Sequence, residues 1–131
     1  TRYMAIALIA GYFWLAVAGL SWIAGGSLVG GGFSYDAMVH TIFLGFVFSM
    51  IFAHAAIIVP AVLGVALPWR AGFYLPLALL HVGLAVRVLG DLAESTFAWR
   101  LGGIVDETAI LLFLAMAVIS SVRAGRSAGS I

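Results

Sequence analysis

The sequence predicts an all-α fold, an integral membrane four-helix bundle with both termini in the cytoplasm. Of its 131 residues, 65% are hydrophobic and 8% are charged, and the mean hydropathy is +1.23. A soluble domain carries about 25% charged residues, so this chain has too few to cover a water-facing surface. Its apolar residues fall into four stretches long enough to cross about 30 Å of hydrocarbon.

Residues 1–131 are expected to form a single transmembrane domain. The predicted spans cover about 3–24, 37–67, 72–89 and 101–122. The first stretch is longer than a signal-peptide core and is expected to remain as a span. Its small residues Ala7, Gly11 and Ala18 share one helix face, which suits close packing against another helix.

Two features are expected to shape the second span and its approach. The glycine-rich segment Gly25–Tyr35 lacks the flanking elements of a phosphate-binding loop, so it is either a flexible connection or a packing site. Asp36 follows and can cap the first turn of the helix. Pro60 removes one backbone hydrogen bond and is expected to kink the helix.

Charged residues predict the orientation of the four spans. One side receives Arg2, Arg70, Arg123 and Arg126, and the other receives Asp36, Asp91, Glu94, Asp106 and Glu107. The positive-inside rule then places both termini in the cytoplasm of a multi-pass protein in a bacterial-type inner membrane. Asp106 and Glu107 are expected at the start of the fourth helix, where carboxylates favour the helix dipole.

Several function classes are excluded or disfavoured by composition. The chain has no cysteine, which excludes disulfides, iron–sulfur clusters and covalently attached c-type haem. A net charge of +1 without a basic cluster predicts no nucleic-acid partner. No hydrolytic motif is present, so an electron-transfer or accessory protein is expected rather than an enzyme. The expected partners are the lipid bilayer and other membrane subunits or further copies of the chain.

The three histidines carry the functional prediction. His40 and His54 are fourteen residues apart on one predicted span, so a regular helix would direct both to nearly the same side, about 21 Å apart. Counted from the turn at Pro68 and Trp69, His54 and His81 lie at the same depth within roughly 3 Å. We therefore expect His54 and His81 to be the axial ligands of one non-covalent haem b.

Alternatives remain for each of these residues. His54 and His81 can instead donate hydrogen bonds to neighbouring helices, and His40 can serve a second cofactor, a partner or no ligand. Arg87 can hold a haem propionate, or it can pair with Asp91 one turn away.

A resemblance to a known family adds to this interpretation. It rests on His40-Thr41, Gly45-Phe46, Met50-Ile51, His54-Ala55, His81 and Arg87-Val88-Leu89. This stretch of about fifty residues resembles helices of NnrS-type haem- and copper-associated membrane proteins, whose chains have many more spans. More distantly it resembles the catalytic subunits of haem–copper oxidases. The resemblance implies that these histidines bind haem or copper.

Together these observations predict a small membrane b-type haem protein that transfers electrons, alone or as a subunit of a respiratory or photosynthetic complex. One alternative is a non-catalytic accessory or assembly subunit of a membrane complex. The other, suggested by the resemblance alone, is a protein that handles copper or nitric oxide.

Overall fold

A computed structural model describes residues 2–25 and 33–128, and these form helices without any strand. The elements are α1 (Arg2–Gly25), α2 (Phe33–His40), the π-helix η1 (Thr41–Val47), α3 (Phe48–Leu63), the 3₁₀ turn η2 (Ala71–Phe73), α4 (Tyr74–Leu92) and α5 (Thr96–Ala128). Four helical stretches in this part of the chain are long and apolar enough to cross a membrane. The all-α prediction is therefore confirmed.

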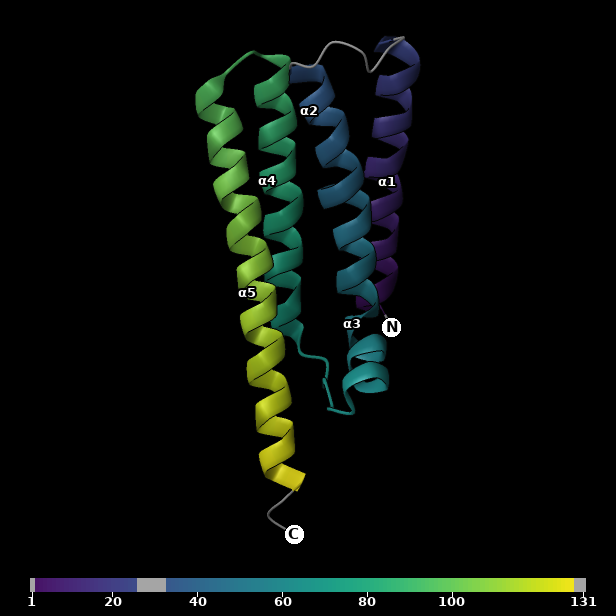
Figure 1. Ribbon diagram of the computed structural model, residues 1–131, viewed down its shortest axis with the longest axis vertical. Helices are drawn as coiled ribbons and strands as arrows, with labels where there is room; N and C mark the ends of the chain where they lie inside the picture. The colour runs from purple at the N-terminus through teal and green to yellow at the C-terminus, as the bar shows by residue number, and fades with distance from the viewer. Residues whose placement is uncertain (1, 26–32, 129–131) are drawn as a thin grey trace.

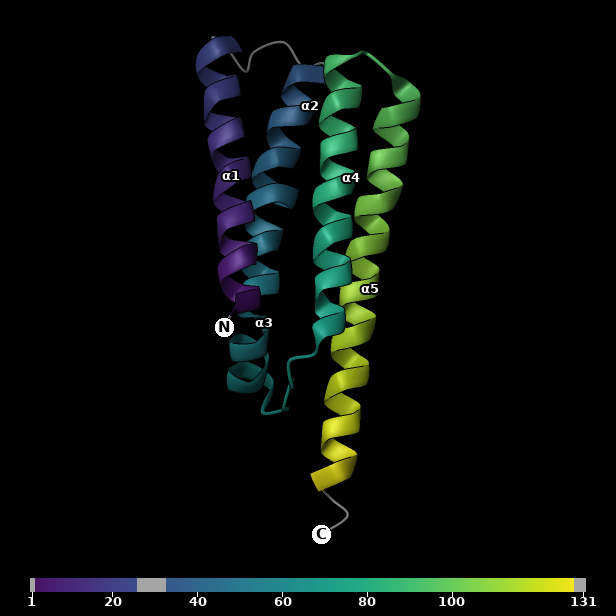
Figure 2. The same ribbon diagram turned by 180° about the vertical axis from the view of Figure 1, so that it is seen from behind.

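The long helices lie side by side along one axis, in the order α1, α2–α3, α4 and α5 (Figures 1 and 2). Both termini and the connection from α3 to α4 lie at one end of the molecule (Figure 1). The start of α2 and the connection from α4 to α5 lie at the other end. Arg70 and Asp36 therefore belong to opposite ends, as the charge pattern predicted.

The second span ends earlier than predicted. Helix α3 stops at Leu63 because Gly64 has a φ of 66° and its N–H donates to the carbonyl of Pro60 at 3.0 Å. A left-handed residue of this kind commonly closes a helix, and glycine adopts it without a steric penalty. Pro60 lies inside α3 without ending it. In the predicted loop Gly25–Tyr35, residues 26–32 lie outside the described part of the chain.

The fourth helix begins earlier than predicted. Helix α5 starts at Thr96, so Asp106 lies ten residues inside it, about 15 Å from its first residue. The prediction that Asp106 and Glu107 meet the helix N-terminus is therefore wrong. The reason is that the helix also includes Phe97, Trp99 and Arg100, which precede the apolar stretch used to predict the span.

The segment Thr41–Val47 makes the second span irregular, because it is a π-helix between α2 and α3. At its start the Thr41 hydroxyl donates to the carbonyl of Met38 at 2.8 Å, and after its end the Ser49 hydroxyl donates to that of Gly45 at 2.5 Å. A π-helix contains more residues per turn than an α-helix. The premise of a regular helix, from which His40 and His54 were predicted to share one side, is therefore wrong.

Small residues bring α1 against the second span. Ala7 and Ala18 are fully or almost fully buried. A Cβ atom added to Gly11 would lie 2.8 Å from Cε of Met50 and 3.0 Å from Cβ of Ser49. The prediction that Gly11 faces another helix at close range is confirmed.

Glycines also let α4 and α5 touch along their backbones. A Cβ atom added to Gly102 would lie 2.6 Å from the backbone nitrogen of Arg87, and one added to Gly90 would lie 2.6 Å from that of Trp99. Contacts this short leave no room for a larger residue. The close approach of the two helices positions the polar side chains described next.

Candidate functional site

The carboxylate of Asp36 joins three helices. Arg87 on α4 donates from Nε to Oδ2 at 3.1 Å and from Nη2 to Oδ1 at 3.2 Å, and Trp99 on α5 donates from Nε1 to Oδ2 at 2.8 Å. A guanidinium that engages both oxygens of a carboxylate forms one of the stronger polar contacts in proteins. The side chains of Arg87 and Asp36 are 11% and 28% exposed, so the pair is largely shielded from surrounding solvent.

Arg87 therefore pairs with Asp36, and the predicted local pair of Arg87 with Asp91 is wrong. The Arg87 guanidinium lies over the Trp99 ring, with Cζ 4.6 Å from the ring centroid. This cation–π contact and the bidentate pair together hold the guanidinium on Asp36 of α2. Asp91 is 3% exposed, and neither of its carboxylate oxygens has a hydrogen-bond partner among the described residues.

His40 is fixed by the backbone of the same Asp36. Its Nδ1 donates to the carbonyl oxygen of Asp36 at 2.8 Å and lies 3.4 Å from the carboxylate oxygen Oδ1. Because a carbonyl only accepts, Nδ1 carries the hydrogen, and in the neutral ring Nε2 keeps its lone pair. Metal-binding histidines commonly show this arrangement, with one ring N–H donated to a carbonyl or carboxylate.

A cavity of about 500 Å³ lies beside this cluster. We call it the His40 cavity; its walls are His40, Leu44, Arg87, Trp99, Arg100, Gly103, Ile104, Asp106, Glu107 and Ile110. His40 is the one histidine among the described residues that line it. Two predicted cofactor-binding residues, His40 and Arg87, thus meet at one cavity, although the sequence had placed neither beside the other.

Asp106 is an unexpected member of the wall. It is 2% exposed, and its two carboxylate oxygens have no hydrogen-bond partner in the described part of the chain. A Cβ atom added to Gly83 of α4 would overlap Oδ1 of Asp106. A buried polar group without a partner is rare and costs about 1–3 kcal/mol. Asp106 thus places an unpaired carboxyl group, packed against Gly83, in the wall of the His40 cavity.

His54 and His81 lie outside the His40 cavity, and His54 is bonded in the same way as His40. Nδ1 of His54 donates to the carbonyl of Met50, one turn earlier on α3, at 2.8 Å. Nδ1 of His81 accepts from the indole Nε1 of Trp14 at 3.0 Å. Indole only donates, so the hydrogen of the neutral His81 ring is on Nε2. That nitrogen is buried without a partner among the described residues.

The bond from Trp14 decides whether His81 can serve as the predicted haem ligand. An imidazole nitrogen that carries hydrogen has no lone pair for a metal, so His81 has no free ligand atom while Trp14 donates to it. The sharing of one iron by His54 and His81 stays a prediction. Across residues 2–25 and 33–128, no three or more His, Asp or Glu side chains gather into a metal-ion site.

Comparison with known proteins assigns the chain to a family. The sequence profile described as Domain of unknown function (DUF8744) matches residues 1–122, so the chain belongs to this family. No curated protein matches the chain. No solved structure matches it either.

Proposed function

We propose that this member of the DUF8744 family is a small integral membrane protein that binds a b-type haem in the His40 cavity and transfers electrons, alone or as a subunit of a respiratory or photosynthetic complex. One observation carries the proposal. His40 has its Nδ1 hydrogen engaged by a backbone carbonyl and lines a cavity of about 500 Å³ together with Arg87 and Arg100. An imidazole held in this way presents a lone pair for iron.

The surface of the helices supports membrane embedding. Large apolar side chains face outward along the chain, for example Ile9 at 71%, Ile23 at 82% and Phe97 at 77% exposure. Lipid tails can cover such a surface, whereas water cannot do so favourably. The charge pattern supports an orientation with both termini in the cytoplasm and a location in a bacterial-type inner membrane.

The His40 cavity offers the groups that haem needs. Arg87 uses Nε and Nη2 on Asp36, while its Nη1 lies 2.8 Å from where a Cβ atom of Gly103 would be. That nitrogen and Arg100 can hold propionates by charge-assisted hydrogen bonds. Leu44 and Ile110 supply apolar contacts for a macrocycle. Bound haem would supply one-electron chemistry, and these residues would fix its position.

An absorption spectrum tests this proposal. The purified membrane protein, oxidised and then reduced with dithionite, should show a Soret band and reduced α and β bands after expression with sufficient haem. His40→Ala should lose these bands, whereas His54→Ala and His81→Ala should keep them. A protein that stays colourless after addition of haem contradicts the proposal. If the His54 and His81 variants lose the bands and His40→Ala keeps them, the iron is bound by His54 and His81 instead.

A non-catalytic accessory or assembly subunit is the second candidate. The bond between Trp14 and His81 favours it, because a ring nitrogen that could bind a metal is used to join α1 to α4. The outward apolar surface can contact other membrane subunits or further copies of the chain. A protein without haem that co-purifies with a defined membrane complex would support this candidate over the first.

A role in handling nitric oxide or copper is a third possibility. It is favoured by the single imidazole at the His40 cavity, because iron bound by one histidine keeps a position open for a diatomic ligand. A shift of the Soret band when nitric oxide meets the reduced protein would support gas binding. Metal analysis of the same sample distinguishes iron from copper.

A further inference from the structure

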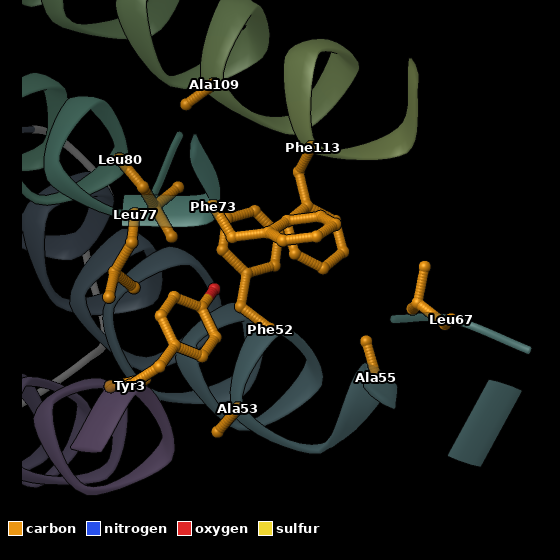
Figure 3. Packing of buried hydrophobic residues seen from close by; sticks show 11 residues of the cluster. Tyr3, Phe52, Ala53, Ala55, Leu67, Phe73, Leu77, Leu80, Ala109 and Phe113 are labelled. Carbon is orange, nitrogen blue, oxygen red and sulfur yellow. The ribbon is translucent and has the colours of Figure 1, made fainter. Parts of the chain in front are cut away.

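A second cavity lies toward the other end of the molecule, near the chain termini. It has a volume of about 240 Å³, and we call it the Tyr3 cavity. Its buried wall comes from α1, α3, η2, α5 and the connection after α3, and consists of Tyr3, Phe52, Ala53, Ala55, Leu67, Phe73 and Phe113. Figure 3 shows these residues around the aromatic pair of Phe52 and Phe113.

Flat aromatic surfaces dominate this wall. The rings of Phe52 and Phe113 stack with centroids 3.8 Å apart and an interplanar angle of 8°. Phe73 packs against Phe113 at 5.5 Å between centroids. Aromatic side chains favour stacked or edge-on contact with another planar ring, so the wall suits a planar ligand.

The hydroxyl of Tyr3 is the exception in this apolar wall. Tyr3 is 5% exposed, and its hydroxyl has no hydrogen-bond partner among the described residues. Figure 3 shows the hydroxyl directed toward Phe73 and Phe52, not back along α1. A buried tyrosine hydroxyl usually finds a partner, and leaving it without one costs free energy. A ligand with an acceptor atom would remove that cost.

We infer that the Tyr3 cavity binds a planar six-membered ring that carries a carbonyl acceptor, the chemistry of a quinone, with the Tyr3 hydroxyl donating to the carbonyl. An apolar cavity of about 150 Å³ holds benzene, so 240 Å³ suits one substituted ring. A lipid acyl chain would fill the apolar space but leave the hydroxyl unpaired. The quinone ring satisfies both the aromatic wall and the hydroxyl.

The mouth of the Tyr3 cavity suits a ligand dissolved in a membrane. It is formed by the exposed residues Ala56, Ile57 and Trp69, with Ile57 56% and Trp69 47% exposed. These side chains offer an apolar path from surrounding lipid. The Tyr3 and His40 cavities share no wall residue, so the quinone proposal does not depend on haem binding and either can fail alone.

Two probes of the same shape test the proposal. Duroquinone and durene share a tetramethylated ring, but only duroquinone carries carbonyl groups. Their binding to the chain in lipid nanodiscs is measured by calorimetry, with the signal of empty nanodiscs subtracted. The wild-type chain should bind duroquinone about tenfold more tightly than durene, which corresponds to 1.4 kcal/mol. Tyr3→Phe removes only the hydroxyl and should abolish this preference while durene binding stays unchanged.

A second variant examines the position of the site. Ala56→Trp places a large ring at the mouth, on an exposed position where folding is little affected, and should weaken the binding of both probes at least tenfold. Equal affinities for duroquinone and durene in the wild-type chain would overturn the proposal in favour of a purely apolar cavity for acyl chains. Failure of the wild-type chain to bind either probe, or unchanged binding in Ala56→Trp, would overturn it as well.

Discussion

Asp36→Asn is expected to loosen the contact between α2, α4 and α5. The change preserves the shape of the side chain but removes its charge. Asp36 accepts two hydrogen bonds from Arg87 and one from Trp99. Asparagine offers one acceptor oxygen in place of two, and its amide hydrogens would face the guanidinium. Arg87, held over the Trp99 ring, would then lose the carboxylate that it contacts.

The size of the effect follows from the exposure of the pair. Breaking a fully buried pair by removing one partner costs about 3–5 kcal/mol, whereas an exposed pair contributes about 0–1 kcal/mol. With side chains 11% and 28% exposed, Arg87 and Asp36 lie between these limits. We therefore expect Asp36→Asn to lower the free energy of unfolding by about 2 kcal/mol, partway between the two ranges.

Unfolding in mixed micelles, followed by the loss of helical circular dichroism, measures this change. Glu94→Gln is the matched control, because it removes one charge from an exposed position in the connection between α4 and α5. A double-mutant cycle of Asp36→Asn with Arg87→Gln should give a coupling of at least about 1 kcal/mol. Effects that simply add, or an Asp36→Asn effect equal to that of the control, would show that the contact between Asp36 and Arg87 does not stabilise the fold.

Three further changes address other contacts. Gly83→Ala should destabilise the chain by about 1–3 kcal/mol, because its Cβ would overlap a buried carboxylate of α5. The control is Gly19→Ala, whose Cβ meets open space and should not destabilise the chain. Unfolding in micelles compares the two variants. Gly64→Ala should cost about 1 kcal/mol by the same measurement, since φ is 66° there. Trp14→Phe should cost about 1–3 kcal/mol, because Nδ1 of His81 loses its donor; equal stability would mean that the bond contributes nothing.

The sequence was enough to predict the long helices but not the residues at which they begin and end. Composition and the length of the apolar stretches predicted four long helices, because burial of apolar residues in lipid requires little beyond hydrophobicity and length. The ends depended on single residues. Gly64 closes α3 through its left-handed backbone. In the fourth span, helix α5 already begins at Thr96, before its apolar part. Asp106 therefore lies inside the helix and not at its start.

The candidate site was predicted only in part, because its contacts lie between helices. His40 and Arg87 were singled out because ionisable side chains are rare in this apolar chain, and the structure places both at one cavity. Asp36 was assigned a local capping role, yet its carboxylate joins residues 51 and 63 positions away. Rotation of one helix against another cannot be read from one sequence, and the π-helix Thr41–Val47 changes it again within the second span.

Rescue by free imidazole tests whether His40 holds haem iron. In His40→Gly the lost side chain leaves space beside the His40 cavity, and added imidazole can occupy it as a free ligand. We expect His40→Gly to lose the Soret band of the haem-loaded wild-type chain, and we expect millimolar imidazole to restore it. His54→Gly should keep its Soret band before any imidazole is added. A Soret band in His40→Gly that equals the wild-type band without imidazole would show that His40 does not hold the iron.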